Sequence, residues 1–400
     1  MVDGWKIHTI GDLFEIKAGG DLQKQYYSAV PTDIFKYQIF ANSLENKGLY
    51  GYTSQPRFDG DAVTITGRGD IGHAEYRPDR FDAIVRLLVL MPKVDIDCKY
   101  ITYYINSLVH FPKENTGVPQ LTAPKVKRIK INLPETKLEQ TAIANILSKV
   151  DEAIASVQKS ISAAERLKKS LMQNLLTGRM KPDGTLRKDD EFYVDEKFGK
   201  VPKGWEVKAI GDKSFCTINP SYKYKKKEVY DFVPMDAVRE RFGGLDYIEK
   251  QIIDNGSYTR FKTGDILFAK ITPCSENGKV AYIEHIESEI GFASTEFIVF
   301  HPTEQVDGRF VYMMLVSGNV HRLAISLMEG TTGRQRIPWK IFQNRIFVAM
   351  PNKKEQAEIV QLLISFDKQI IDKQINITIL DQLKKSLMQN LLTGKVRVRL

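Results

Sequence analysis

Two stretches of the chain place apolar residues at alternating steps of about three and four, the spacing of a helix that buries one narrow stripe. In the first stretch, the stripe consists of Ile143, Leu147, Val150, Ile154, Val157 and Ile161. In the second, it consists of Ile359, Leu363, Phe366, Ile370 and Ile377. Residues 135–177 and 352–393 contain no glycine or proline. The pattern predicts two helices of roughly 40 residues, each about 60 Å long at 1.5 Å per residue.

These predicted helices are near copies of one another. The twelve residues LKKSLMQNLLTG occur at 167–178 and again, unchanged, at 383–394, an offset of 216. The same offset carries Glu139-Gln140 onto Glu355-Gln356. A single amphipathic helix of this kind would favour dimerisation through a coiled coil, but two copies in one chain favour pairing within the chain. We therefore expect the helices to form an antiparallel intramolecular coiled coil, with a glycine cap at Gly178 and Gly394.

The segments between the helices differ from one another in length and sequence. Each opens on a similar motif, GWKIHTIGD at 4–12 and GWEVKAIGD at 204–212. Short β-branched and aromatic runs follow, broken by glycine, proline and asparagine, at 61–66, 81–90, 264–271 and 295–300, and these runs are typical of strands. Helices are predicted at Cys98–Val109 and Gly308–Leu327. Each segment is therefore expected to form a compact α+β domain.

The predicted domain organisation is a pseudo-twofold internal repeat of α+β class. Its parts are a first domain at 1–133, a long helix at 134–178, an exposed connector at 179–202, a second domain at 203–350, a second long helix at 351–394 and a tail at 395–400.

Composition and charge narrow the function further. The chain has 400 residues and a formal net charge of +9, which permits a polyanionic partner. Its three cysteines, Cys98, Cys216 and Cys274, are far apart in sequence and offer neither a disulfide framework nor metal-ligand spacing. No long apolar run or leader peptide is evident, so a cytoplasmic protein without a membrane contact is expected.

The order of variable domain, EQ-containing helix entry and LLTG helix exit, twice over, resembles the specificity subunits of Type I restriction-modification systems. The VPKGW motif at 201–205 and the GDILFAKI and TTGRQRI stretches of the second domain strengthen the resemblance. It implies that each variable domain is a target-recognition domain for one half of a split double-stranded DNA sequence. It also implies that the helices set the gap and dock two methyltransferase subunits, to which ATP-dependent restriction subunits are added.

Four motif-like strings suggest catalysis, and each has a simpler interpretation. TGRGDIG at 66–72 fits GxGxxG but is followed by another strand-like run instead of a helix. NPSY at 219–222 departs from the NPPY tetrapeptide of adenine methyltransferases at Ser221. The carboxylates at 183 and 195 imitate a nuclease pattern but fall in the polar connector, and His73 with Glu75 lacks the cysteine pair of a zinc deaminase. A freestanding methyltransferase or nuclease stays the alternative, whereas the favoured reading is a non-catalytic subunit without a cofactor.

DNA contact requires cations for phosphates and amide or guanidinium groups for base edges. The candidates in the first domain are Arg57, Arg68, Gln120, Lys125 and Lys127. Those in the second domain are Lys223, Lys225, Lys226, Lys227, Lys270, Arg334, Gln335 and Arg336. The sequence does not separate base contacts from phosphate contacts among them.

The ends of the two long helices carry more apolar residues than one helix pair can bury. These residues are Met172, Leu175 and Leu176 and their copies Met388, Leu391 and Leu392. We therefore expect a methyltransferase subunit to cover this surface.

Overall fold

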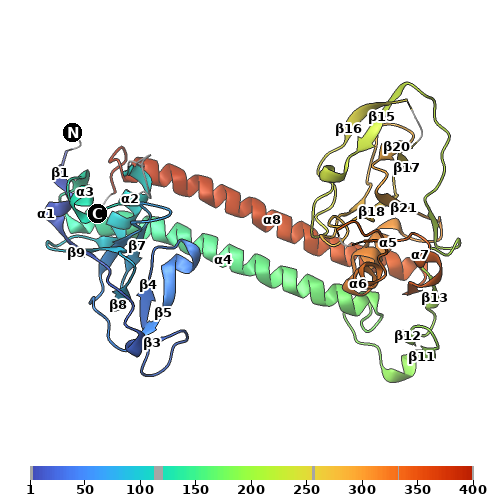
Figure 1. Cartoon of the computed structure of the whole chain (residues 1–400), viewed down its shortest axis with the longest axis horizontal. Helices are drawn as coiled ribbons and strands as arrows, with labels where there is room; N and C mark the ends of the chain where they lie inside the picture. Colours follow the sequence, from blue (N-terminus) through green and yellow to red (C-terminus); the bar gives the residue numbers. More distant parts are fainter. Residues whose placement is uncertain (1–2, 112–119, 255–256, 332, 399–400) are drawn as a thin grey trace. The chain divides into compact units, whose positions relative to one another are not determined.

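The computed structural model describes residues 3–111, 120–254, 257–331 and 333–398 (Figure 1). The chain forms two compact units. The first unit consists of Met1–Ser160 and Lys373–Leu400, and the second of Ile161–Asp372. The predicted division treated the long helices as separate segments, whereas their packing assigns one half of each helix to each unit.

The two predicted long helices are present as α4 (Lys137–Leu176) and α8 (Lys353–Leu391). Gly178 and Gly394 follow them with φ of +68° and +72°, a left-handed conformation that glycine adopts without strain. Equivalent backbone bonds close both ends, from Gly178 N–H to the Leu175 carbonyl and from Gly394 N–H to the Leu391 carbonyl.

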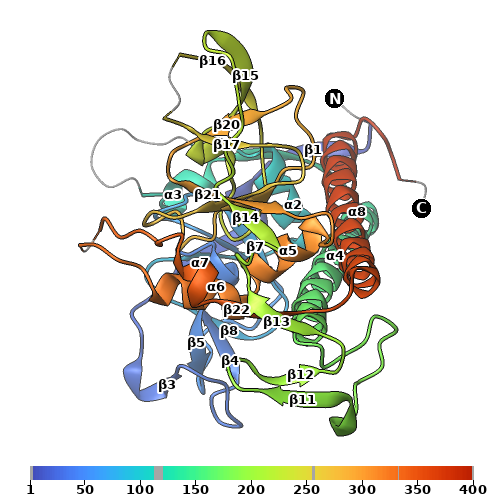
Figure 2. The ribbon, with the colours of Figure 1, turned by 90° about the vertical axis from the view of Figure 1, so that its right-hand side faces the viewer.

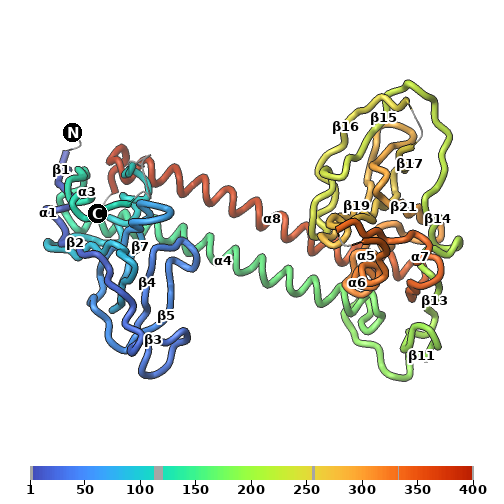
Figure 3. The backbone as a smooth tube through the Cα atoms, in the orientation of Figure 1, coloured from blue at the N-terminus to red at the C-terminus, as the bar shows by residue number. Residues whose placement is uncertain are grey.

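In the first unit, two four-stranded sheets pack around the domain core. One has the order β2 (Phe14–Ala18), β9 (Leu88–Pro92), β6 (Ala62–Ile65) and β7 (Ala74–Arg77). The other has the order β3 (Tyr27–Ser28), β5 (Leu49–Thr53), β4 (Tyr37–Phe40) and β8 (Phe81–Ala83). A two-stranded sheet joins β1 (Trp5–Thr9) to β10 (Lys130–Pro134). The helices are α1 (Ile10–Leu13), α2 (Cys98–Leu108) and α3 (Ala123–Lys127). Both chain ends belong to this unit (Figure 3).

The second unit repeats this plan. One four-stranded sheet has the order β14 (Cys216–Ile218), β21 (Phe297–Pro302), β18 (Ile266–Ala269) and β19 (Val280–Tyr282). The other has the order β16 (Glu249–Ile253), β15 (Glu228–Val233), β20 (Gly291–Ala293) and β17 (Thr259–Phe261). A two-stranded sheet joins β13 (Glu206–Ala209) to β22 (Phe347–Met350). The helices are α5 (Gly308–Val316), α6 (Gly318–Ser326) and α7 (Ile341–Asn344). The connector contains the hairpin β11 (Phe192–Asp195) and β12 (Gly199–Pro202) (Figure 2).

Two predicted elements are broken in the structure. The strand-like run 81–90 divides into β8 and β9, which belong to different sheets, and Val85 and Arg86 make the crossing with φ of 53° and 60°. The predicted helix Gly308–Leu327 divides into α5 and α6 at Ser317, whose backbone is extended. Neither break contains proline. The second falls at Ser317-Gly318, a dipeptide typical of turns that the helix prediction did not take into account.

The duplicated glutamine of the EQ motif fixes each long helix to its own domain. The Gln140 side chain accepts from Asp97 N–H at 3.0 Å and donates to the Pro134 carbonyl at 2.9 Å. Gln356 makes the same two bonds, with Asp307 N–H at 2.8 Å and the Pro351 carbonyl at 2.8 Å. Both glutamines are buried. Since a buried amide needs its partners, this pair of bonds explains why the motif occurs twice.

The long helices run antiparallel within each unit. Lys168 of α4 pairs with Asp367 of α8 in the second unit, and Lys384 of α8 pairs with Asp151 of α4 in the first, at 2.6 Å. The offset of 216 carries one ion pair onto the other. The first residues of each apolar stripe pack into the core of the domain that precedes the helix. Ile143 and Leu147 lie in the core of the first unit, and Ile359 and Leu363 lie in the core of the second unit. The predicted fold, two α+β domains with an antiparallel helix pair, is confirmed.

Candidate nucleic-acid interface

In the first unit, three segments distant in sequence meet beyond the ends of β6 and β8. We call residues 66–73, 84–87 and 120–122 the first loop cluster. The Leu121 N–H donates to the Gly67 carbonyl at 2.9 Å. The Asn42 side chain joins the segment 66–73 to the segment 84–87, because it accepts from Gly67 N–H at 2.7 Å and donates to the Val85 carbonyl at 2.6 Å.

The second unit builds the same arrangement from residues 270–279, 294–296 and 333–337, the second loop cluster. Its Ile337 N–H donates to the Lys270 carbonyl at 2.8 Å, and its Lys270 N–H donates to the Glu296 carbonyl at 2.9 Å. Because the offset of 216 carries Leu121 onto Ile337, both clusters contain the same backbone bond, from the segment before the long helix to a residue just after β6 or β18, and we call this bond the shared backbone framework. The N–H groups of Gly67 and Lys270 have different acceptors, the Asn42 side chain and the Glu296 carbonyl. The two clusters also differ in the side chains that this framework presents.

Six of the predicted DNA-binding residues lie in these clusters. In the first, the Arg68 guanidinium donates to the Gln120 side-chain oxygen at 3.5 Å. The second holds four more, namely Lys270, Arg334, Gln335 and Arg336. The Lys270 ammonium donates to the Thr295 carbonyl at 2.7 Å, and Arg336 forms an ion pair with Glu296. This contact lowers the pKa of Glu296 and raises that of Arg336, since each charge stabilises the other.

The remaining predicted DNA-binding residues lie outside the clusters. Arg57 donates to both oxygens of the buried Asp82 carboxylate, at 2.5 and 3.0 Å, and therefore serves the interior of the first domain. Lys125 and Lys127 are on α3.

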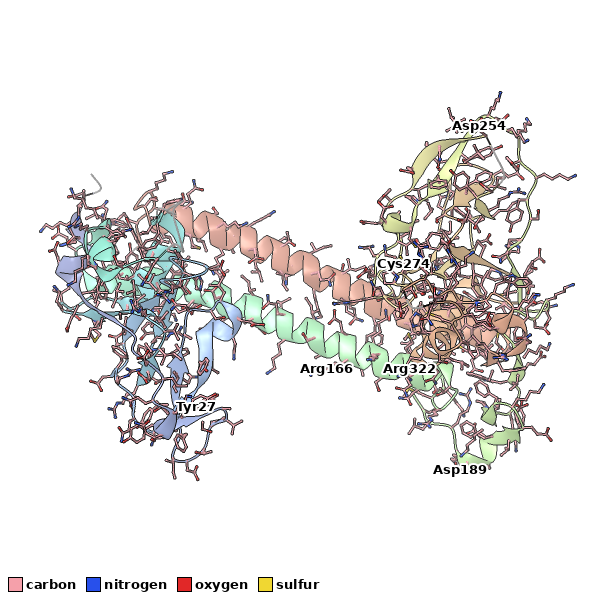
Figure 4. All side chains as sticks on the ribbon, in the orientation of Figure 1. Tyr27, Arg166, Asp189, Asp254, Cys274 and Arg322 are labelled. Carbon is pink, nitrogen blue, oxygen red and sulfur yellow. The ribbon has the colours of Figure 1, made fainter. Side chains whose placement is uncertain are left out.

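The run Lys223, Lys225, Lys226 and Lys227 precedes β15, whose opposite end, Val233, pairs with Ala293 next to the second loop cluster. Figure 4 shows this separation, with Asp254 beyond the tip of β15–β16 and Cys274 in the loop cluster. The tyrosines between the lysines are also committed to the fold. Tyr222 donates to Asp265 at 3.4 Å, and the Tyr224 ring packs edge-on against Phe292 at 5.2 Å. The run therefore presents charge without free aromatic rings.

The motif-like strings have structural roles. Asn219 of NPSY accepts from Val299 N–H through its side chain at 3.0 Å and holds its loop on β21. TGRGDIG forms the turn between β6 and β7, with Gly69 and Gly72 at φ of 68° and 91°. Asp183 and Asp195 accept from nearby backbone N–H groups of their own turns, and His73 pairs with Glu75 at 3.0 Å.

The predicted partner surface requires a correction. Leu175, Leu176, Leu391 and Leu392 are buried, with exposed fractions of 0, 4, 5 and 0%. Each pair packs into the core of its own unit, beside Trp205 in the second and Trp5 in the first. Counting apolar faces on a helix pair missed this because the count left out residues from the rest of each unit, such as Trp205 and Trp5. Of the six residues predicted to contact the partner, Met172 and Met388 alone are partly exposed.

Met172 lines a hollow of about 760 Å³ in the second unit. Its floor is apolar and includes Leu176, Val320 and Ile346. Four cations surround it, Lys169, Lys197, Arg322 and Arg345, and the described lining includes no carboxylate. Arg322, on α6, is labelled in Figure 4. The hollow can therefore accept an apolar segment that carries negative charge.

Some residues of the clusters had no signal in the sequence. Glu296 and Arg86 were seen only as parts of the strand-like runs 295–300 and 81–90, and Asn42, which holds two segments of the first cluster together, carried no motif. Their importance comes from contacts with segments more than 20 residues away, which a single sequence does not reveal.

The two loop clusters, with a different set of donors and acceptors in each, define a protein with two candidate binding sites, one in each unit. Comparison with known proteins names the family. The model of the Type I restriction modification DNA specificity domain matches residues 2–166 and 202–381, and the chain belongs to this family. This membership confirms the resemblance to specificity subunits of Type I restriction-modification systems that the duplicated helices predicted.

Individual relatives agree with this assignment. The chain is 32% identical over 214 residues to the Type I restriction enzyme EcoEI specificity subunit of Escherichia coli, a match that spans 52% of this chain and only 34% of that protein. It is 24% identical to the putative MjaX specificity subunit of Methanocaldococcus jannaschii, over 99% of this chain and 95% of that one. The S subunit of M. genitalium has the same fold, with a TM-score of 0.57 at 16% identity over 98% of this chain and 96% of that one.

Among the helices of the described residues, none combines the length and the hydropathy needed to cross a bilayer.

Proposed function

We propose that each loop cluster reads one half of a two-part double-stranded DNA target. The observation that carries the proposal is the shared backbone framework of the two clusters, on which Arg68 and Gln120 stand in one copy and Arg334, Gln335 and Arg336 in the other. Guanidinium and amide groups make the paired bonds by which bases are distinguished in the major groove. Two different sets on one framework fit two different half-sites.

The partners are two methyltransferase subunits, with ATP-dependent restriction subunits added, acting on DNA in the cytoplasm. A methyltransferase subunit is the occupant we propose for the hollow beside Met172. The cationic rim and apolar floor suit an amphipathic segment with acidic residues. Methylation and cleavage belong to these partners, so the chain needs no cofactor of its own.

A domain exchange tests the reading function. Residues 1–133 would be replaced by the corresponding domain of a related chain, and the exchanged chain would be assembled with its methyltransferase subunits. Methylated adenines would then be mapped across a host genome. One half of the methylated motif is expected to change while the other half and the gap stay the same. A change of both halves together would contradict independent reading.

The helix pair is proposed to set the gap between the half-sites. Seven residues inserted after Val157 and seven after Lys373, which the offset of 216 makes equivalent positions, preserve the apolar stripe. Each helix lengthens by about 10 Å, which corresponds to roughly three base pairs. The same half-sites with a wider gap are expected in methylation mapping. An active variant that keeps its original gap would exclude the helices as the ruler.

A further inference from the structure

The Arg336 guanidinium is held side-on by a carboxylate. Its Nε donates to Oε2 of Glu296 at 3.0 Å, and its Nη2 donates to Oε1 at 2.9 Å. This two-bond contact fixes the plane of the guanidinium group. Within the described contacts, Nη1 and the second N–H of Nη2 stay available, and they point along the edge of the group that faces away from the carboxylate.

The backbone on both sides of this ion pair is also fixed. The N–H and carbonyl of Arg336 pair with those of Glu329, at 2.8 and 2.9 Å. Its neighbour Gln335 accepts from Thr272 N–H at 3.1 Å, and Glu296 accepts from Lys270 N–H at 2.9 Å. Both charged residues are thus attached to the short segment 270–272. A group held in this way loses little freedom when it binds a ligand.

Loop stability does not account for the ion pair. The two side chains are 48% and 25% exposed, and pairs this open to solvent contribute little to folding. The backbone bonds already close the loop. The alternative role is to aim the guanidinium outwards from the loop cluster.

We propose that Arg336, positioned by Glu296, reads a guanine in the half-site of the second domain. A planar guanidinium with its far edge free matches O6 and N7 of guanine, the pair of acceptors that this base alone presents in the major groove. The inference rests on the proposed function, since it names the base that one loop cluster contacts.

The first loop cluster offers a matched control. The offset of 216 places Gln120 where Arg336 stands, and the strand registers place Arg86 where Glu296 stands. That cluster therefore presents an amide and carries no carboxylate at the equivalent position. Substituting Gln120 should alter the other half of the target only.

The experiment uses the full chain assembled with its methyltransferase subunits. Wild type, Arg336→Lys, Arg336→Ala, Glu296→Gln and Gln120→Ala would be compared by mapping methylated adenines and by measuring DNA affinity across a salt series. Hydrogen exchange would verify that each variant is folded. Arg336→Lys keeps the positive charge but loses the planar guanidinium group with its paired N–H donors. Glu296→Gln keeps the shape of the side chain but loses the negative charge that holds the guanidinium in place.

For Arg336→Lys and Arg336→Ala, we expect loss of the preference for one G·C pair in the second half-motif, with affinity for the original site reduced roughly ten- to hundredfold. Glu296→Gln should relax the same position to a smaller extent. The slope of log Kd against log salt should stay the same for Arg336→Lys, and Gln120→Ala should change the first half-motif instead.

Three results would overturn the inference. The first is a second half-motif that contains no guanine. The second is a set of Arg336 variants that retain the original motif and show only a salt slope smaller by about one, because this result marks a phosphate contact. The third is a set of Arg336 variants that change neither the motif nor the slope. If the wild-type complex methylates no two-part motif at all, the proposed function itself fails, and this outcome is distinct from the other three.

Discussion

Replacing Leu175 by aspartate is expected to unfold the second unit. Leu175 is fully buried in the core that contains Val201 and Trp205. An aspartate there would either leave a charge buried without a partner or require its protonation, and it would also remove the leucine contacts, a combined cost of several kcal/mol. Since domains are stable by only about 5–15 kcal/mol, this cost is large. Hydrogen exchange resolved by peptide should show loss of protection in 161–372 while 3–111 stays protected.

Leu391→Asp is the matched variant, because Leu391 occupies the equivalent place in the first unit and is 5% exposed. It should reverse the pattern, with protection lost in the first unit and kept in the second. Full protection in both units of either variant would contradict the burial of these leucines.

Met172→Glu separates folding from assembly. The side chain lies one helical turn before Leu175–Leu176, is partly exposed and lines the cationic hollow. The variant should keep its hydrogen-exchange protection and lose affinity for the methyltransferase subunit, as measured by sedimentation of the mixture. The partner segment proposed for the hollow is apolar on the side that meets Met172, and a charge there would be desolvated. A folded Met172→Glu chain that assembles normally would remove the hollow as the docking site.

The sequence predicted the long helices, their antiparallel pairing and the repeat because those features are periodic or identical within the chain. Glycine caps and the EQ motif also occur twice, which makes them visible without knowledge of their contacts. The assignment of Leu175 and Leu391 to an external surface was wrong because residues outside the helix pair bury them, among them Trp205 and Trp5. Periodicity shows which face of a helix is apolar and leaves open what covers that face.

The same distinction, between features repeated in the sequence and contacts made by distant residues, applies to the DNA-binding candidates. Gln120 and Arg336, whose contact with DNA stays a prediction, were selected because the repeat offset marks their positions as equivalent. Arg57 looked equally suitable as a cation in a polar loop, yet the buried Asp82 that it contacts is 25 residues away. Glu296 was missed for the converse reason, since an acid is not a candidate for a phosphate contact. Its role depends on Arg336, which is 40 residues away.

The connector contributes Arg187 to a buried ion pair with Glu355, and we expect the loss of this pair to lower the stability of the second unit strongly. Arg187 binds the Glu355 carboxylate, and its other terminal nitrogen donates to the carbonyls of Gly178 at 2.9 Å and Met180 at 3.2 Å. The second oxygen of Glu355 accepts from the Trp205 indole at 3.1 Å. The two charged side chains are only 9% and 16% exposed. One arginine thus joins the end of α4 to the beginning of α8 within the second unit.

Arg187→Met is expected to destabilise the second unit by about 3 kcal/mol, because the methionine leaves the Glu355 charge buried with the indole as its only described donor. Arg187→Met combined with Glu355→Gln should recover most of this loss, since the amide carries no charge and still accepts from Trp205. Lys354→Met removes a surface pair on the same helix, whose lysine is 87% exposed, and should change nothing measurable. Native-state hydrogen exchange over a urea series would give the free energy of unfolding of each unit. If Arg187→Met and Lys354→Met have equal effects, the Arg187 ion pair does not hold the second unit together.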